Sequence, residues 1–218
     1  MSTSAKIIQL RELLAERGLA TVAKPGQRLL AGWPALDAAA GDGLPKGDLT
    51  ELHCPRHGGA LAVAQLLAAA RHFAGLIDGS DSFDLAGLAP AALARLLWVR
   101  CRNAGEAVKA ADLLLRDGNL PLVLMNLRGC ADAARVPSQA WYRLQRIVEV
   151  SGASLLVLTP RPMIPSARVR IALHRIFTLD DLDRDRAELV AALHFQTGRV
   201  QGTRWENDQW KMTNDQAG

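Results

Sequence analysis

Between Gly32 and Leu61 the chain has a segment with the length and placement of a phosphate-binding loop, set between a strand and a long apolar helix. A working loop reads G-x-x-x-x-G-K-[ST]: backbone N–H groups cradle the phosphates, the lysine adds charge, and the hydroxyl places Mg²⁺. The eight corresponding positions here are Cys54, Pro55, Arg56, His57, Gly58, Gly59, Ala60 and Leu61. Only the second glycine matches, so the segment predicts the frame of a nucleotide-binding loop without its lysine or its hydroxyl.

The residues ahead of this loop resemble a known family. They read G-W-P-A-L-D at 32–37, G-L-P-K-G at 43–47 and L-T-E-L at 49–52. This order is similar to the start of the ATPase core in the RecA recombinase superfamily, which has G-x-x-x-L-D, a turn with L-P-x-G, a strand and then the phosphate loop. The resemblance covers roughly residues 28–200 and implies a RecA-like core.

Within that superfamily the chain most resembles the ImuA family, small RecA-like accessory proteins of bacterial SOS mutagenesis that are often grouped with the SulA cell-division inhibitors. Two later stretches are also similar to this family: L-W-V-R at 97–100, and R-L-Q at 143–145 leading into L-L-V-L at 155–158. The resemblance implies an accessory role in translesion synthesis rather than recombination.

Apolar runs alternate with helical patterns, which is typical of a parallel sheet with right-handed crossovers. We expect buried strands at 48–54, 96–101, 120–127 and 154–159, helices at 60–76, 104–116 and 137–150, and a surface loop at 77–90. Past Pro165 we expect strands at 168–177, 188–196 and 199–204, the last two joined by Thr197-Gly198. The predicted fold is α/β: a RecA-like core with a mostly parallel mixed sheet, flanking helices and an antiparallel C-terminal edge.

The chain is expected to divide into an N-terminal helix with its connector (1–28), the RecA-like core (29–205) and a disordered polar tail (206–218). The helix, at residues 4–17, has an apolar stripe formed by Ile7, Leu10 and Leu14. Either it folds back on its own domain, or it docks on a RecA-fold partner or on another copy of the chain.

Two further positions predict that ATP is not hydrolysed. The carboxylate that organises magnesium in the family should end the apolar strand at 120–125, where the chain has Asn126 in this vestigial Walker B motif. The family's catalytic glutamate should follow the strand at 96–99, where the chain reads Arg100-Cys101-Arg102. With the degenerate Walker A loop, these positions predict a protein that is not an enzyme and has no cofactor.

Cysteine and histidine spacing and the length of apolar segments limit which classes of protein the chain can belong to. Three widely spaced cysteines, Cys54, Cys101 and Cys130, are expected to be reduced, buried thiols, and the five histidines show no metal-ligand spacing. The N-terminus has no apolar core of signal-peptide length, and no segment approaches eighteen uninterrupted apolar residues, so we expect a cytoplasmic protein without a membrane partner.

Direct DNA binding is a separate possibility raised by the resemblance, because RecA proteins bind strands through loops that follow two central strands. The corresponding loops here are at 128–136 and 160–167. Arg161, Arg168 and Arg170 in or next to the second loop are candidate phosphate contacts. The alternative is a solvated basic edge, since no aromatic residues offer a stacking platform for single strands.

These observations favour a non-catalytic accessory protein of error-prone translesion synthesis in the bacterial DNA-damage response. By resemblance, its partners would be an ImuB-like polymerase homologue, RecA and an error-prone DNA polymerase, together with weak non-specific DNA binding and self-association. Two alternatives stay open at this point: a SulA-type cell-division inhibitor, and a recombination mediator that binds single-stranded DNA.

Overall fold

The computed structural model describes residues 26–54, 58–174 and 177–199. Within these residues a seven-stranded sheet forms the centre of the molecule, in the order β5-β4-β6-β7-β3-β8-β9. The predicted N-terminal helix at 4–17 with Ile7, Leu10 and Leu14, most of its connector, and the predicted tail at 206–218 lie outside the described residues.

All the strands of this sheet run parallel except β9, which pairs antiparallel with β8 at one edge. The strands are β3 (Asp48–His53), β4 (Ala74–Asp78), β5 (Leu96–Arg100), β6 (Leu122–Asn126), β7 (Ser154–Thr159), β8 (Val169–His174) and β9 (His194–Arg199). A separate two-stranded sheet pairs β1 (Arg28–Leu29) with β2 (Leu44–Pro45). The predicted α/β class, with a mostly parallel mixed sheet and an antiparallel C-terminal edge, is confirmed, and the arrangement is consistent with a RecA-like fold.

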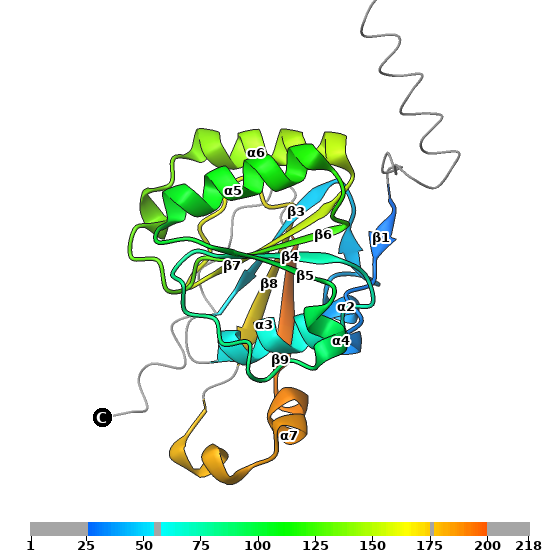
Figure 1. The fold of residues 1–218 in the computed structure, drawn as a ribbon, viewed down its shortest axis with the longest axis vertical. Coiled ribbons are helices and arrows are strands. Elements are labelled where there is room, and N and C mark those ends of the chain that lie inside the picture. Colours follow the sequence, from blue (N-terminus) through cyan, green and yellow to red (C-terminus); the bar gives the residue numbers. More distant parts are fainter. Residues whose placement is uncertain (1–25, 55–57, 175–176, 200–218) are drawn as a thin grey trace, which may run out of the picture.

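Helices cover both faces of the sheet (Figure 1). On one face lie α5 (Ala104–Asp117) and α6 (Ser138–Ser151), and on the other lie α2 (Pro34–Ala39), α3 (Gly58–Ala69) and α4 (Pro90–Leu93). The last helix, α7 (Arg186–Ala191), precedes β9, and short 3-10 turns occupy Ala133–Arg135 and Leu179–Asp183.

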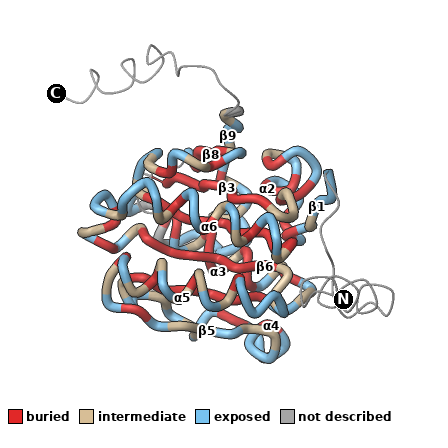
Figure 2. Tube along the Cα trace, turned by 90° about the horizontal axis from the view of Figure 1, so that it is seen from above, coloured by how far each residue is buried: buried red, intermediate tan, exposed pale blue. Residues whose placement is uncertain are grey.

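The core forms two apolar layers because side chains alternate between the two faces of each central strand. In β6, Leu122 and Leu124 pack on the α3 side, whereas Val123 and Met125 pack on the α5–α6 side. Figure 2 shows the buried residues concentrated along these middle strands, with exposed residues on the outer surfaces of the helices. Strands buried on both faces are expected where helices cover both sides of a parallel sheet.

The two long outer helices match the predictions closely. In α6 the inward stripe of Trp141, Leu144 and Val148 is buried, as predicted. Both helices end at a glycine in the left-handed region, Gly118 with φ 74° and Gly152 with φ 71°, because L side chains are strained there.

The predicted helix at 60–76 is too long. It ends at Ala69, and Ala74–Asp78 instead forms β4, a fully buried strand between β5 and β6. Because the apolar run is continuous, the pattern does not mark where the helix ends and the strand begins. A short apolar segment fits a buried helix and a buried strand equally well. A Cβ added at Gly75 would lie 2.9 Å from Leu120 Cδ1, so the Leu120 side chain would have to shift to accept it. The predicted loop at 77–90 therefore begins only after Asp78.

β5 was predicted to be a buried strand, and it is an edge strand. It pairs only with β4 among the described strands, and Leu97 is 46% exposed. The sequence pattern of an apolar edge strand and of a central strand is the same over so few residues, so pairing decides which one forms.

The antiparallel edge is built differently from the prediction. Thr197 and Gly198 do not join two strands; they lie inside β9 and pair with Ile171 and Arg170 of β8. Tertiary contacts hold β9 in place: Thr197 Oγ1 donates a hydrogen bond to the Ala39 carbonyl at 2.6 Å, and the Phe195 ring packs edge-on against Trp33. Residues 186–191, part of which was predicted as strand, form α7.

Candidate functional site

The candidate site lies where the parallel strands end, the usual position for ligands in open α/β sheets. Cys54 follows β3 there, and Asp78 and Asn126 are the last residues of β4 and β6 and pair in register. Asn126 thus ends the strand that would carry the Walker B carboxylate. The segment between β3 and α3 stands where a phosphate-binding loop would stand; Pro55, Arg56 and His57 of that segment lie outside the described residues.

The first turn of α3 is covered by the protein's own side chains. Gly58 is buried, and a Cβ there would lie 3.3 Å from Leu193 Cδ2, 3.4 Å from Leu173 Cδ2 and 3.5 Å from Phe177 Cε2. A phosphate would need backbone N–H groups at this helix start to be accessible. At Gly58, leucine and phenylalanine carbons surround the place that a side chain would take.

Gly59, the one glycine that matches the phosphate-loop pattern, is also buried. The guanidinium of Arg128, from the loop after β6, lies directly against it, so that a side chain at position 59 would collide with that guanidinium. Ala60 is exposed and has no charge, while Leu61 packs against the α3-side core. Arg128 and apolar side chains therefore pack around the first two residues of α3.

Asn126 acts as a connecting group between loops. Its carbonyl oxygen accepts a hydrogen bond from Gly79 N at 2.9 Å, and its side-chain oxygen accepts one from Arg128 N at 3.4 Å. The side chain is 5% exposed. The backbone carbonyl of Asn126 thus links the ends of β4 and β6, and its neutral side-chain amide has no negative charge to offer a metal ion.

The prediction for the catalytic glutamate used the wrong strand. The strand that directly follows α3 is β4, not β5, so the relevant residues come after Asp78 rather than after Val99. This position does hold carboxylates, Asp78 and Asp81. The argument from the basic Arg100-Cys101-Arg102 sequence therefore does not apply.

Both carboxylates make contacts within the fold, but Asp78 Oδ1 is buried and has no hydrogen-bond partner among the described residues. Asp78 is fully buried, and its Oδ2 accepts a hydrogen bond from Phe83 N at 2.7 Å. Asp81 pairs with Arg100 at 2.5 and 2.8 Å, and the hydrogen bond from Arg100 lowers the pKa of Asp81 below its ordinary value. The Arg100 guanidinium also lies over the Trp98 ring, 5.1 Å from its centroid.

A buried ion pair that the sequence analysis missed lies in the middle of the sheet. Glu51 is completely buried in β3 and accepts hydrogen bonds from Arg170 Nε at 2.6 Å and Thr159 Oγ1 at 2.9 Å. It also accepts from the backbone N–H groups of Met163 at 2.7 Å and Ile164 at 3.3 Å. The one available signal was a glutamate inside the apolar run L-T-E-L, since an ionised side chain is rarely buried without a partner.

This ion pair fixes the loop between β7 and β8. Arg170 Nη2 donates to the Ile164 carbonyl at 2.7 Å, so the loop is bound to both members of the pair. Burial raises the pKa of Glu51, while the charge of Arg170 and the hydrogen bonds act in the opposite direction. A proline-rich loop is thus tied at its centre to β3.

The three candidate DNA-contacting arginines have different environments. Arg170 is 8% exposed and paired with Glu51, so the prediction that it contacts phosphate is wrong. Arg168 is exposed but pairs with Asp48, the first residue of β3, at 3.1 Å. Arg161, just after β7, is exposed at the opposite end of the strands. The three side chains therefore do not form one basic cluster.

Among the described residues, the cysteines and histidines show no catalytic arrangement. Cys54, Cys101 and Cys130 are buried, as expected, and form no disulfide with one another, and burial raises the pKa of Cys130 to about 11. Burial lowers the pKa of His53 to about 4, with the charges of His174 and Arg170 acting in the same direction. Over the described residues, no group of three or more His, Cys, Asp or Glu side chains is placed to hold a metal ion.

Comparisons with known proteins do not assign a family. No protein-family model matches the chain, and no curated protein sequence matches it. Within the described part of the chain, no helix has the length and apolar character needed to cross a membrane.

Proposed function

We propose that this chain is a non-enzymatic, RecA-like accessory protein of error-prone translesion DNA synthesis in the bacterial DNA-damage (SOS) response. It acts in the cytoplasm through protein contacts with an ImuB-like polymerase homologue, RecA and an error-prone DNA polymerase. The proposal combines the sequence resemblance with one structural observation, the covered first turn of α3.

That observation bears directly on catalysis. A phosphoryl-transfer enzyme needs the helix start free, a lysine near the β- and γ-phosphates and a hydroxyl for Mg²⁺. Here Arg128 and the apolar side chains of Leu173, Phe177 and Leu193 cover the turn, and Ala60 and Leu61 replace the two functional side chains. The α/β core keeps its sheet and helices although it lacks this nucleotide site. Its outer surfaces therefore remain available for binding other proteins. The link from fold to function is an analogy.

Calorimetric titration with Mg-ATP tests the loss of nucleotide binding. We expect no binding by the parent protein, and micromolar affinity would overturn the proposal. A variant with Ala60→Lys and Leu61→Thr restores the missing groups but leaves the cover in place, so it should also fail to bind. Adding Arg128→Ala to that variant removes the guanidinium from Gly59 and shows whether this side chain alone blocks the site.

A cellular experiment tests the biological role. In the source bacterium, deletion of the gene should reduce the frequency of mutations induced by DNA damage, and reintroduction of the parent gene should restore it. The Ala60→Lys, Leu61→Thr variant should restore it equally well, because the function does not use the loop. If deletion leaves mutagenesis unchanged but abolishes damage-induced filamentation, the chain is a division inhibitor and the proposal is wrong.

A further inference from the structure

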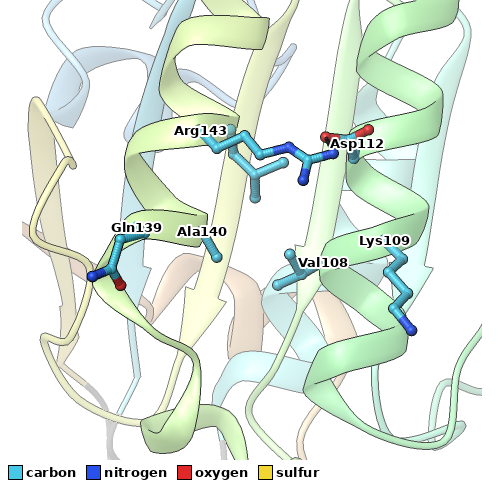
Figure 3. A pocket seen from close by; sticks show the side chains of 7 residues that line it. Val108, Lys109, Asp112, Gln139, Ala140 and Arg143 are labelled. Atoms are coloured by element: carbon cyan, nitrogen blue, oxygen red, sulfur yellow. Dashed lines mark ion pairs between the residues drawn. The ribbon is translucent and has the colours of Figure 1, made fainter.

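A groove runs between α5 and α6 on the outside of the helix layer (Figure 3). Its volume is about 270 Å³, and it opens to solvent. The apolar part of its lining consists of Val108, Ala140 and Leu144, of which Leu144 is buried. An opening of this size between two helices accommodates an apolar side chain from another molecule.

The polar part of the lining consists mainly of hydrogen-bond donors. Lys109 and Gln139 lie on opposite sides of the groove, and Arg143 extends from α6 toward α5 (Figure 3). The one carboxylate, Asp112, is already engaged by Arg143 at 2.7 Å and Arg116 at 2.8 Å. Lys109 is exposed and has no ion-pair partner among the residues that the structure describes. Arg143 is shared with Asp112 but has further N–H donors, and Gln139 has both a donor and an acceptor. With Lys109, the groove as a whole offers mainly donors and positive charge to a ligand.

We propose that this groove binds an acidic segment of a partner protein. The segment inserts one apolar side chain between α5 and α6 and places carboxylates against Lys109 and Arg143. This is the helix-in-groove type of recognition, with one anchor residue and charges at the rim. The open shape favours a protein segment, since small-molecule sites enclose most of their ligand. The inference deepens the proposed function, on which it rests, by naming the chemistry of one protein contact.

Fluorescence anisotropy with the full chain and a short labelled peptide tests this site. The probe is a helical peptide with one central leucine flanked by glutamates on an alanine background. We expect saturable binding that weakens with added salt. Lys109→Ala should weaken it about three- to fivefold, the effect of losing one exposed ion pair. Ala140→Phe, which fills the groove, should weaken binding at least about tenfold. Lys109→Glu, which reverses an exposed charge and leaves the core untouched, should also weaken binding.

Matched controls separate this site from general charge attraction. Arg146→Ala removes an exposed arginine of α6 that does not line the groove, and it should leave binding unchanged. A peptide with serine in place of the leucine should bind at least about tenfold more weakly. Equal binding of this peptide, equal binding by Ala140→Phe, or no saturable binding by the parent would overturn the groove assignment. Binding of Mg-ATP would instead overturn the proposed function, so the two failures are distinguishable.

Discussion

The Glu51–Arg170 pair gives the sharpest test of how this fold is held together. Glu51→Gln keeps the size of the side chain and an oxygen that can accept from Thr159, Met163 and Ile164, but it removes the charge opposite Arg170. Arg170 is 8% exposed, so its guanidinium would then be a buried charge without its counterion. Breaking a buried pair from one side typically costs about 3–5 kcal/mol. We therefore expect the free energy of unfolding to fall by about that amount.

Equilibrium urea unfolding, followed by fluorescence, measures this loss directly. Arg168→Met is the matched control, because it removes an exposed arginine from the start of the same region; it should cost no more than about 1 kcal/mol. In a double-mutant cycle, Glu51→Gln with Arg170→Met should recover part of the loss, since no uncompensated charge remains. A decrease below about 1 kcal/mol for Glu51→Gln alone would show that the pair does not stabilise the sheet as the contacts indicate.

Four other outcomes follow from the structure or from the sequence. Because the pKa of His53 falls from 6.5 to about 4 on folding, the unfolded chain binds more protons between these values. As the pH decreases from 6.5 to about 4, stability should fall by up to about 3 kcal/mol more than in His53→Leu, as measured by urea unfolding. Gly32→Ala should destabilise the fold by at least about 1–3 kcal/mol in the same assay, because Gly32 has φ 82° and an added Cβ would collide with the Ala69 carbonyl. Any binding to single-stranded DNA should be weak and should fall steeply with salt; if Arg161→Ala binds as well as the parent, that arginine makes no contact. Deleting residues 1–18 should leave the melting temperature nearly unchanged and abolish partner association in a pull-down; an unfolded product would show that the segment belongs to the core.

The parts of the fold that the sequence predicted well have strong local signals. The helical patterns at 104–116 and 137–150 located α5 and α6 closely. Apolar runs likewise located β3 and β7, although they could not distinguish central strands from edge strands. β4 was missed because an unbroken apolar segment continues from α3 into it, and only pairing with β5 and β6 makes it a strand.

The candidate site was predicted only in part, for a similar reason. Substitutions at Ala60, Leu61 and Asn126 can be read directly against a linear pattern. By contrast, the contact between Arg128 and Gly59, and the pairing of Glu51 with Arg170, join residues that are far apart in the chain. No local pattern encodes such partners, so the burial of Arg170 and the occupied helix turn required the three-dimensional arrangement.

The packing of Arg128 on Gly59 changes the meaning of that glycine. In a nucleotide-binding protein, a glycine at this position allows the backbone to approach a phosphate, and its replacement is expected to impair function first. In this chain any larger residue at position 59 would displace the Arg128 guanidinium, so the first expected effect is a rearrangement of that side chain. A glycine that matches the ATP-binding pattern therefore also has a structural reason to be present that involves no nucleotide.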